Sequence, residues 1–241
     1  MSSGVHIALS AQMTMERRMS TIAVNLANMN TPGYRAEEVR FETLMSKPGP
    51  DGVAFASAGQ AYTSLRSGQV TYSGNPLDVA VQGDVWLALQ TPGGRVLTRD
   101  GRLQMTATGE LKSVAGHAVL DPGGTAILLD PAAGQVEIGM DGAITQAGRT
   151  VGSIGLFEMP AGAQIARYGN SGLIPDGQAA PIIDFTGKGL RQGYIEGANV
   201  DPILEMTKMI MVQRAFESAA MAVQQSEDLT QQAITSLGPG T

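Results

Sequence analysis

The chain has 241 residues, 43% of them hydrophobic, and a formal net charge of −6. This length and hydrophobic content suffice for one sizeable core or two small ones. The acidic charge of mixed sign argues against nucleic acid as a partner. The absence of cysteine excludes disulfides and thiolate metal sites.

The first expected element is a helix over about residues 5–29. Its apolar residues recur at alternating intervals of four and three, which is typical of a coiled-coil seam: Met15, Met19, Ile22, Leu26 and Met29. Pro32 and Gly33 should end it, with Asn30 suited to the left-handed position after the last turn. This segment lacks the pattern of a cleavable signal peptide. No run approaches the roughly 20 apolar residues that span a bilayer, so no membrane span is expected.

Two asparagines interrupt this apolar helix. Asn25 and Asn28 lie about one turn apart and therefore on the same side. Asparagine is a poor helix former, because its amide competes for backbone hydrogen bonds. One hypothesis is that these amides pair with backbone groups of loops or neighbouring chains and fix the register of packing. The alternative is that Asn28 and Asn30 merely end the helix.

The expected N-terminal coiled-coil segment covers residues 1–33. The next residues, 34–70, are rich in Gly, Ser and Pro and predict an extended arm or loop. The middle of the chain has the pattern of β-structure. In residues 71–196 turn-forming pairs recur about every 8–12 residues, which indicates a module of short antiparallel strands. Apolar and polar residues alternate over 77–82, which predicts a strand with one buried face. Asp100-Gly101 predicts a hairpin between its flanking strands.

A second helix is expected within residues 197–241. Asp201 can cap it and Pro202 fits its first position. Its seam again alternates intervals of three and four: Met209, Val212, Phe216, Ala219, Val223, Ser226, Thr230, Ala233 and Leu237. The predicted fold class is α+β, with terminal helices that form a coiled coil and a central all-β module. The methionines on both helices read either as plain core packing or as an adaptable interface.

No catalytic constellation emerges from the sequence. His6 and His117 read as surface or partly packed histidines. The stretch "GNSG" at 169–172 lacks the fifth position of a nucleophile elbow, and "TGKG" at 186–189 lacks the first glycine and the final Ser or Thr of a phosphate loop. We therefore expect neither an enzyme nor a bound cofactor or metal.

Three stretches resemble a known family. "NLANMNTPGYR" at 25–35 resembles the N-terminal signature of the flagellar axial proteins, which are the basal-body rod, hook and hook-associated subunits. "GYIEGANVDPILEMTKMIMVQRAFE" at 193–217 resembles their C-terminal signature, and residues 74–121 are similar to their β-module. Val24, Ala198 and the single aromatic Trp86 depart from the usual pattern, which leaves the subtype and the detailed packing open.

The resemblance implies a structural subunit of the flagellar rod within the periplasm, most like the proximal rod type, with the distal rod type as the alternative. It implies helical polymerisation with copies of itself and other rod subunits, export by the flagellar type III apparatus without a cleavable signal peptide, and an arm at 34–70 that braces neighbours. A non-catalytic binding module is a further alternative, but it would need an aromatic-lined site. The residues expected to carry assembly are Met15, Met19, Ile22, Asn25, Leu26, Asn28, Met29, Gly33, Tyr34, Asn199, Val200, Met209, Val212, Arg214, Phe216, Ala219, Val223 and Leu237.

Overall fold

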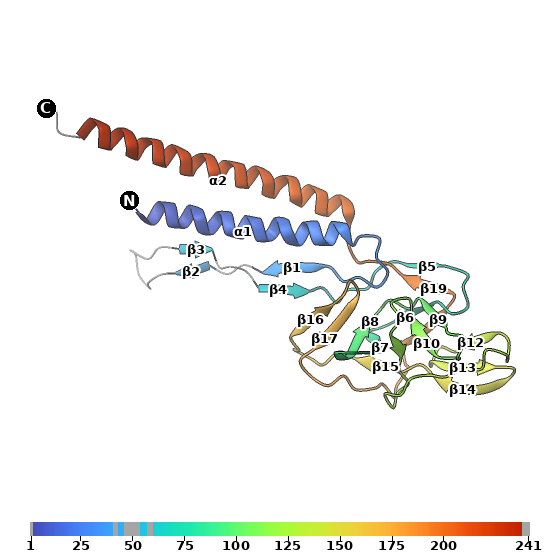
Figure 1. Cartoon of the computed structure of the whole chain (residues 1–241). Coiled ribbons are helices and arrows are strands. Elements are labelled where there is room, and N and C mark those ends of the chain that lie inside the picture. Colours follow the sequence, from blue (N-terminus) through green and yellow to red (C-terminus); the bar gives the residue numbers. More distant parts are fainter. Residues whose placement is uncertain (1, 41–42, 46–53, 57–59, 238–241) are drawn as a thin grey trace. The chain divides into compact units, whose positions relative to one another are not determined.

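Two helices enclose a region of short strands in the order of the chain (Figure 1). A computed structural model describes residues 2–40, 43–45, 54–56 and 60–237. The chain divides into two compact units: unit 1 comprises Met1–Ala27, Glu37–Ser64 and Asp201–Thr241, and unit 2 comprises Asn28–Ala36 and Leu65–Val200. The fold class is α+β, as predicted. Neither helix has a described stretch that is long and apolar enough to span a bilayer.

The two helices, α1 (Ser2–Ala27) and α2 (Pro202–Leu237), pack against each other in unit 1 and run antiparallel (Figure 1). The predicted cap of α2 is confirmed, because the Asp201 carboxylate accepts the backbone N–H groups of Ile203 at 3.0 Å and Leu204 at 3.1 Å. These bonds satisfy two of the amides that a helix leaves unpaired at its start.

The predicted end of the first helix was wrong in detail. α1 ends at Ala27, two residues before the predicted Met29. Asn30 does not take the left-handed conformation; Gly33 does, with φ of 69°. Glycine has no Cβ and adopts this conformation without steric cost, whereas asparagine still loses energy there.

Unit 1 also contains two short antiparallel ribbons, both within the predicted arm. β1 (Glu37–Arg40) pairs with β4 (Gln60–Thr63), and β2 (Thr43–Met45) pairs with β3 (Ala54–Ala56). In the first ribbon, the Tyr62 hydroxyl donates to the Glu38 carboxylate, and the Arg40 guanidinium lies 5.5 Å from the centre of the Tyr62 ring. Strand β1 lies beside α1 (Figure 1).

Unit 2 is built on an eight-stranded antiparallel sheet of order β16-β17-β8-β7-β11-β10-β9, with β15 also paired to β7. Its strands are β7 (Val85–Thr91), β8 (Gly94–Thr98), β9 (Leu103–Met105), β10 (Leu111–Ser113), β11 (Ala118–Val119), β15 (Leu156–Glu158), β16 (Ile165–Tyr168) and β17 (Gly172–Pro175). A three-stranded sheet joins β12 (Val136–Ile138), β13 (Ala143–Gln146) and β14 (Arg149–Ser153). Two ribbons pair β6 (Val79–Gln82) with β18 (Gly189–Gln192), and β5 (Val70–Tyr72) with β19 (Tyr194–Glu196).

Strand β7 separates two hydrophobic clusters. Val85, Leu87 and Leu89 point into the larger cluster, whereas Trp86 and Ala88 point into the smaller one. Alternate residues of a strand face opposite sides, so β7 is covered on both faces. The same holds for β6, in which Val79, Ala80 and Val81 are all buried. The prediction of one buried face at residues 77–82 was therefore wrong.

The hairpin predicted at Asp100-Gly101 was also wrong. β8 pairs with β7 and β17, whereas β9 pairs with β10. Gly101 instead packs against the start of β6: its carbonyl accepts the Val79 N–H at 2.9 Å, and a Cβ at Gly101 would lie 1.8 Å from the Val79 carbonyl oxygen. The glycine of this Asp-Gly pair therefore allows two backbone segments that are distant in sequence to approach closely.

The hairpin between β13 and β14 offers a test of turn chemistry. Its two-residue turn places Ala147 at φ of 45° and Gly148 at φ of 74°, as in a type I′ turn. Because alanine loses about 1 kcal/mol in the left-handed region and asparagine tolerates it better, Ala147→Asn should stabilise unit 2 by about 0.5–1 kcal/mol. Urea unfolding would measure this. Ala132→Asn, in an exposed turn without a positive φ, is the control, and equal effects of both variants would contradict the explanation.

Candidate functional site

Asn25 joins three elements of unit 1. Its side chain is 2% exposed. Its amide nitrogen donates to the Glu37 carbonyl at 2.8 Å, and its amide oxygen accepts the Glu37 N–H at 2.9 Å. The same nitrogen lies 3.3 Å from the Glu205 carboxylate on α2. The amide therefore pairs with Glu37 as a strand partner would, and links α1 to both β1 and α2.

Glu205 completes this group from the first turn of α2. Its side chain is buried, and its second carboxylate oxygen accepts the Lys208 ammonium at 2.6 Å. A carboxylate in the first turn also interacts favourably with the helix dipole. The buried negative charge of Glu205 is thus stabilised by the Asn25 amide, by the Lys208 ammonium and by the positive end of the α2 dipole.

Asn28 has a different role from Asn25. Its side-chain oxygen accepts the Thr31 hydroxyl at 3.2 Å, and its carbonyl accepts the Thr31 N–H at 3.0 Å. These bonds form the turn after α1, in unit 2. Asn25 thus pairs with the backbone of another segment of the same chain, whereas Asn28 pairs within the turn that follows the helix, and a role of either amide in fixing the register of an assembly stays a prediction.

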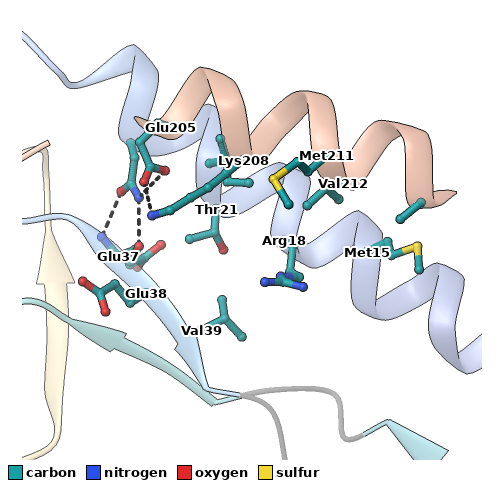
Figure 2. Close-up of a pocket in the computed structure, with 13 residues that line it drawn as sticks. Met15, Arg18, Thr21, Glu37, Glu38, Val39, Glu205, Lys208, Met211 and Val212 are labelled. Atoms are coloured by element: carbon teal, nitrogen blue, oxygen red, sulfur yellow. Dashed lines mark hydrogen bonds and ion pairs between the residues drawn. The ribbon is translucent and has the colours of Figure 1, made fainter. Parts of the chain in front are cut away.

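A groove of about 430 Å³ lies beside Asn25. Helix α1 forms its middle, with α2 on one side and β1 on the other (Figure 2). We call this the unit 1 groove, and its lining residues are Met15, Arg18, Thr21, Ile22, Asn25, Glu37, Glu38, Val39, Glu205, Lys208, Met211, Val212 and Ala215. It combines apolar side chains with three carboxylates and two cations.

The predicted seam residues of the two helices that the structure describes in unit 1 are buried or half-buried. Ile22 and Val212 are buried, and the following are half-buried: Met15, Met19, Leu26, Met209, Phe216, Ala219 and Val223. Met29, in the turn after α1, is half-buried in unit 2. Arg214 is exposed and lies outside the seam. The side chains of Ser226, Thr230, Ala233 and Leu237 lie outside the described residues.

Unit 2 contains a buried charged cluster formed by Arg35, Arg99 and Glu196. One Glu196 carboxylate oxygen accepts Arg35 at 2.6 Å and the Gly68 N–H at 2.8 Å, and the other accepts Arg99 at 3.1 Å. All three side chains are at most 1% exposed. Arg99 also donates to the Val81 and Gly83 carbonyls. One carboxylate therefore forms ion pairs with two guanidinium groups away from water.

The single tryptophan completes this cluster. The guanidinium carbons of Arg35 and Arg99 lie 5.4 Å and 5.0 Å from the centre of the Trp86 ring. In the described structure, Nε and Nη1 of Arg35 and Nε of Arg99 are buried without a hydrogen-bond partner. The negative face of the ring attracts these cations in place of an acceptor. Burial lowers the pKa of Arg35, while the Glu196 carboxylate opposes that shift.

Tyr34 and Asn199 hold together the places where the chain enters and leaves unit 2. The Asn199 side chain accepts a hydrogen bond from the Ala36 N–H at 2.6 Å and donates one to the Arg66 carbonyl at 2.8 Å. The backbone N–H of Asn199 donates to the Tyr34 carbonyl at 3.3 Å. Tyr34 is buried beneath the Arg167 guanidinium, 4.6 Å from the ring centre. Val200, the next residue, is half-buried. The N-terminal and C-terminal signatures thus meet in one set of contacts.

Gly33 is confined between the signatures. Its N–H donates to the Glu196 carbonyl at 2.8 Å, and a Cβ there would lie 2.2 Å from the Asp100 nitrogen. Gly33→Ala adds both a clash and a left-handed alanine, so it should destabilise unit 2 by about 2 kcal/mol more than Gly134→Ala does. Gly134 also has a positive φ but open space around it, so it isolates the clash in denaturant unfolding. Equal losses would contradict the confinement.

Sequence reasoning missed Arg35, Arg99 and Glu196 as a group. They stand, in this order, in the stretches "TPGYR", "VLTRDG" and "GYIEG". In each stretch a charged residue lies within two positions of both an apolar residue and a glycine, which was the available signal. Within the described ranges, no three His, Cys, Asp or Glu side chains form a group that could hold a metal ion.

Three family models match the chain. The one described as Flagella basal body rod protein matches residues 6–35, and Flagellar hook protein FlgE/F/G D1 domain matches residues 80–146. Flagellar basal body rod FlgEFG protein C-terminal matches residues 191–236. The matched ranges include Asn25, Arg35, Arg99 and Glu196.

The chain is also similar to curated proteins over nearly its whole length. It is 48% identical to a flagellar basal-body rod protein FlgF of Mesorhizobium japonicum and 41% identical to that of Rhizobium meliloti, with 99% of each chain covered. It is 27% identical to a flagellar basal-body rod protein FlgG of Bacillus subtilis, over 95% of this chain and 97% of the relative.

Proposed function

Because the chain belongs to the flagellar basal-body rod protein family and is FlgF-like within it, we propose that it is a structural subunit of the proximal flagellar rod. The observation that carries this proposal is the identity of 48% to a protein named FlgF over 99% of both chains. The identity of 27% to a protein named FlgG makes the distal rod the weaker alternative. The role is mechanical and not catalytic.

The terminal helices are proposed to associate as an antiparallel coiled coil. Its support is the pattern of exposure along α2, where Met209, Val212, Phe216, Ala219 and Val223 are buried or half-buried and most residues between them are exposed. Inward positions at alternating intervals of three and four are typical of such a seam. The Asn25 amide would then fix the register of α1 against α2.

Helical polymerisation with copies of itself and with other rod subunits follows from this role. Exposed apolar side chains on α2, including Ile203 and Met221, support further helix packing. We propose that residues 34–70 brace neighbouring subunits, residues 71–196 form the outer module, and residues 1–33 and 197–241 line the shaft. Location within the periplasm and delivery by the flagellar type III export apparatus complete the proposal.

A deletion with complementation tests this function. Cells that lack the gene should be non-motile and should assemble incomplete rods, as seen by electron microscopy of purified basal bodies. The wild-type gene supplied in trans should restore both properties. Normal motility and complete rods in the deletion strain would overturn the proposal.

A further inference from the structure

Helix α2 carries an apolar ridge on its outer side. Ile203, Met206, Ile210 and Met221 are 78%, 49%, 52% and 64% exposed. Their spacing of three, four and eleven residues places them on one face of the helix. Arg214 follows Ile210 by one turn and shares this face. We call these five residues the outer ridge.

The unit 1 groove uses the other side of the same helix. Its α2 residues are Glu205, Lys208, Met211, Val212 and Ala215. At 3.6 residues per turn these positions are centred nearly half a turn from the outer ridge. Ridge and groove also lie at the same height along the axis of α2, because the ridge residues from Ile203 to Arg214 overlap in sequence with the groove residues from Glu205 to Ala215.

The ridge and the groove match in chemistry. The groove offers apolar surface from Met15, Val39 and Met211 between its charged side chains. Its three carboxylates outnumber its two cations. Arg214 forms no ion pair with any residue that the structure describes. An arginine in an apolar ridge therefore has a complementary surface on another copy of the chain.

We propose that the outer ridge of one copy docks into the unit 1 groove of a second copy, with Arg214 directed to the carboxylates of β1. This contact rests on the proposed function and specifies how neighbours pack. Since ridge and groove occupy opposite faces of α2, the contact joins two different surfaces and is heterologous. A row of copies joined in this way has an unoccupied ridge at one end and an unoccupied groove at the other. Repetition gives a ring or an open helix, with copies side by side.

Cysteine pairing tests the contact directly, because the natural chain contains no cysteine. Full-length Ile210→Cys and Thr21→Cys chains would be mixed under mild oxidation. The mixture should give a disulfide-linked dimer several times more abundant than either variant alone. Gln213→Cys, exposed on α2 but outside ridge and groove, is the matched control with Thr21→Cys. Equal cross-linking by the control, or dominant self-pairing of Ile210→Cys, would overturn the contact.

The charge of Arg214 gives a second readout. Arg214→Glu should weaken self-association at least about tenfold in sedimentation velocity, because like charges then meet in the groove. Arg214→Lys should remain within a few-fold of the natural chain. If the chain assembles without a ridge-to-groove cross-link, the docking mode is wrong and the rod function stands. Complete rods in cells that lack the gene would instead overturn the function itself.

Discussion

Replacing Glu196 with alanine should lower the free energy of unfolding of unit 2 by about 3–5 kcal/mol. The change removes the carboxylate with which both Arg35 and Arg99 pair in the described part of the chain, and it removes the acceptor of the Gly68 N–H. An uncompensated buried charge is among the most destabilising changes in a folded protein. The loss should therefore exceed that of an ordinary hydrogen bond.

Guanidinium unfolding followed by Trp86 fluorescence measures this loss. The chain has one tryptophan, and it lies against both arginines, so its signal reports on unit 2 alone. Glu110→Ala is the control, because Glu110 pairs with Lys112 at 2.9 Å with both side chains 29% exposed. That pair should contribute less than about 1 kcal/mol. Similar losses in the two variants would contradict the importance of the cluster.

Replacing Asn25 with alanine should destabilise unit 1 by about 3 kcal/mol, because it removes the two hydrogen bonds that the amide makes to the backbone of Glu37 and a donor to the buried Glu205. The helical signal in circular dichroism should then be lost at a lower denaturant concentration. Trp86 fluorescence should show unit 2 unfolding as before.

Asn28→Ala is the matched control for Asn25. Its side-chain oxygen accepts the Thr31 hydroxyl at 3.2 Å in the turn after α1, a hydrogen bond between neutral groups, so its loss should cost about 1 kcal/mol. If both variants shift the helical transition equally, Asn25 does not join α1 to β1 and α2. If only Asn25→Ala shifts it, the distinction between the two asparagines holds.

Local patterns allowed the helices and the fold class to be predicted. The intervals of three and four that include Ile22 and Val212 follow from helix geometry alone, and Asp201 caps through its immediate neighbours. The end of α1 was less predictable, because Gly33 takes the left-handed position to contact the backbone of Asp100, which is distant in sequence.

Contacts between distant segments account for the remaining errors. Asp100-Gly101 has the local chemistry of a hairpin, but its backbone packs on Val79. Arg35 and Arg99 meet Glu196 across 161 and 97 residues, which no local pattern encodes. Only the resemblance of whole signatures to a family indicated that these stretches belong together, and it did not indicate which atoms meet.

The most direct test of the central claim is quantitative mass spectrometry of basal bodies stripped of filaments and extracted with detergent from the source cells. A rod subunit should be enriched together with other rod subunits, and more strongly than abundant envelope proteins. Absence of the chain from the basal bodies of motile cells would contradict the structural role and return a non-catalytic binding module to consideration.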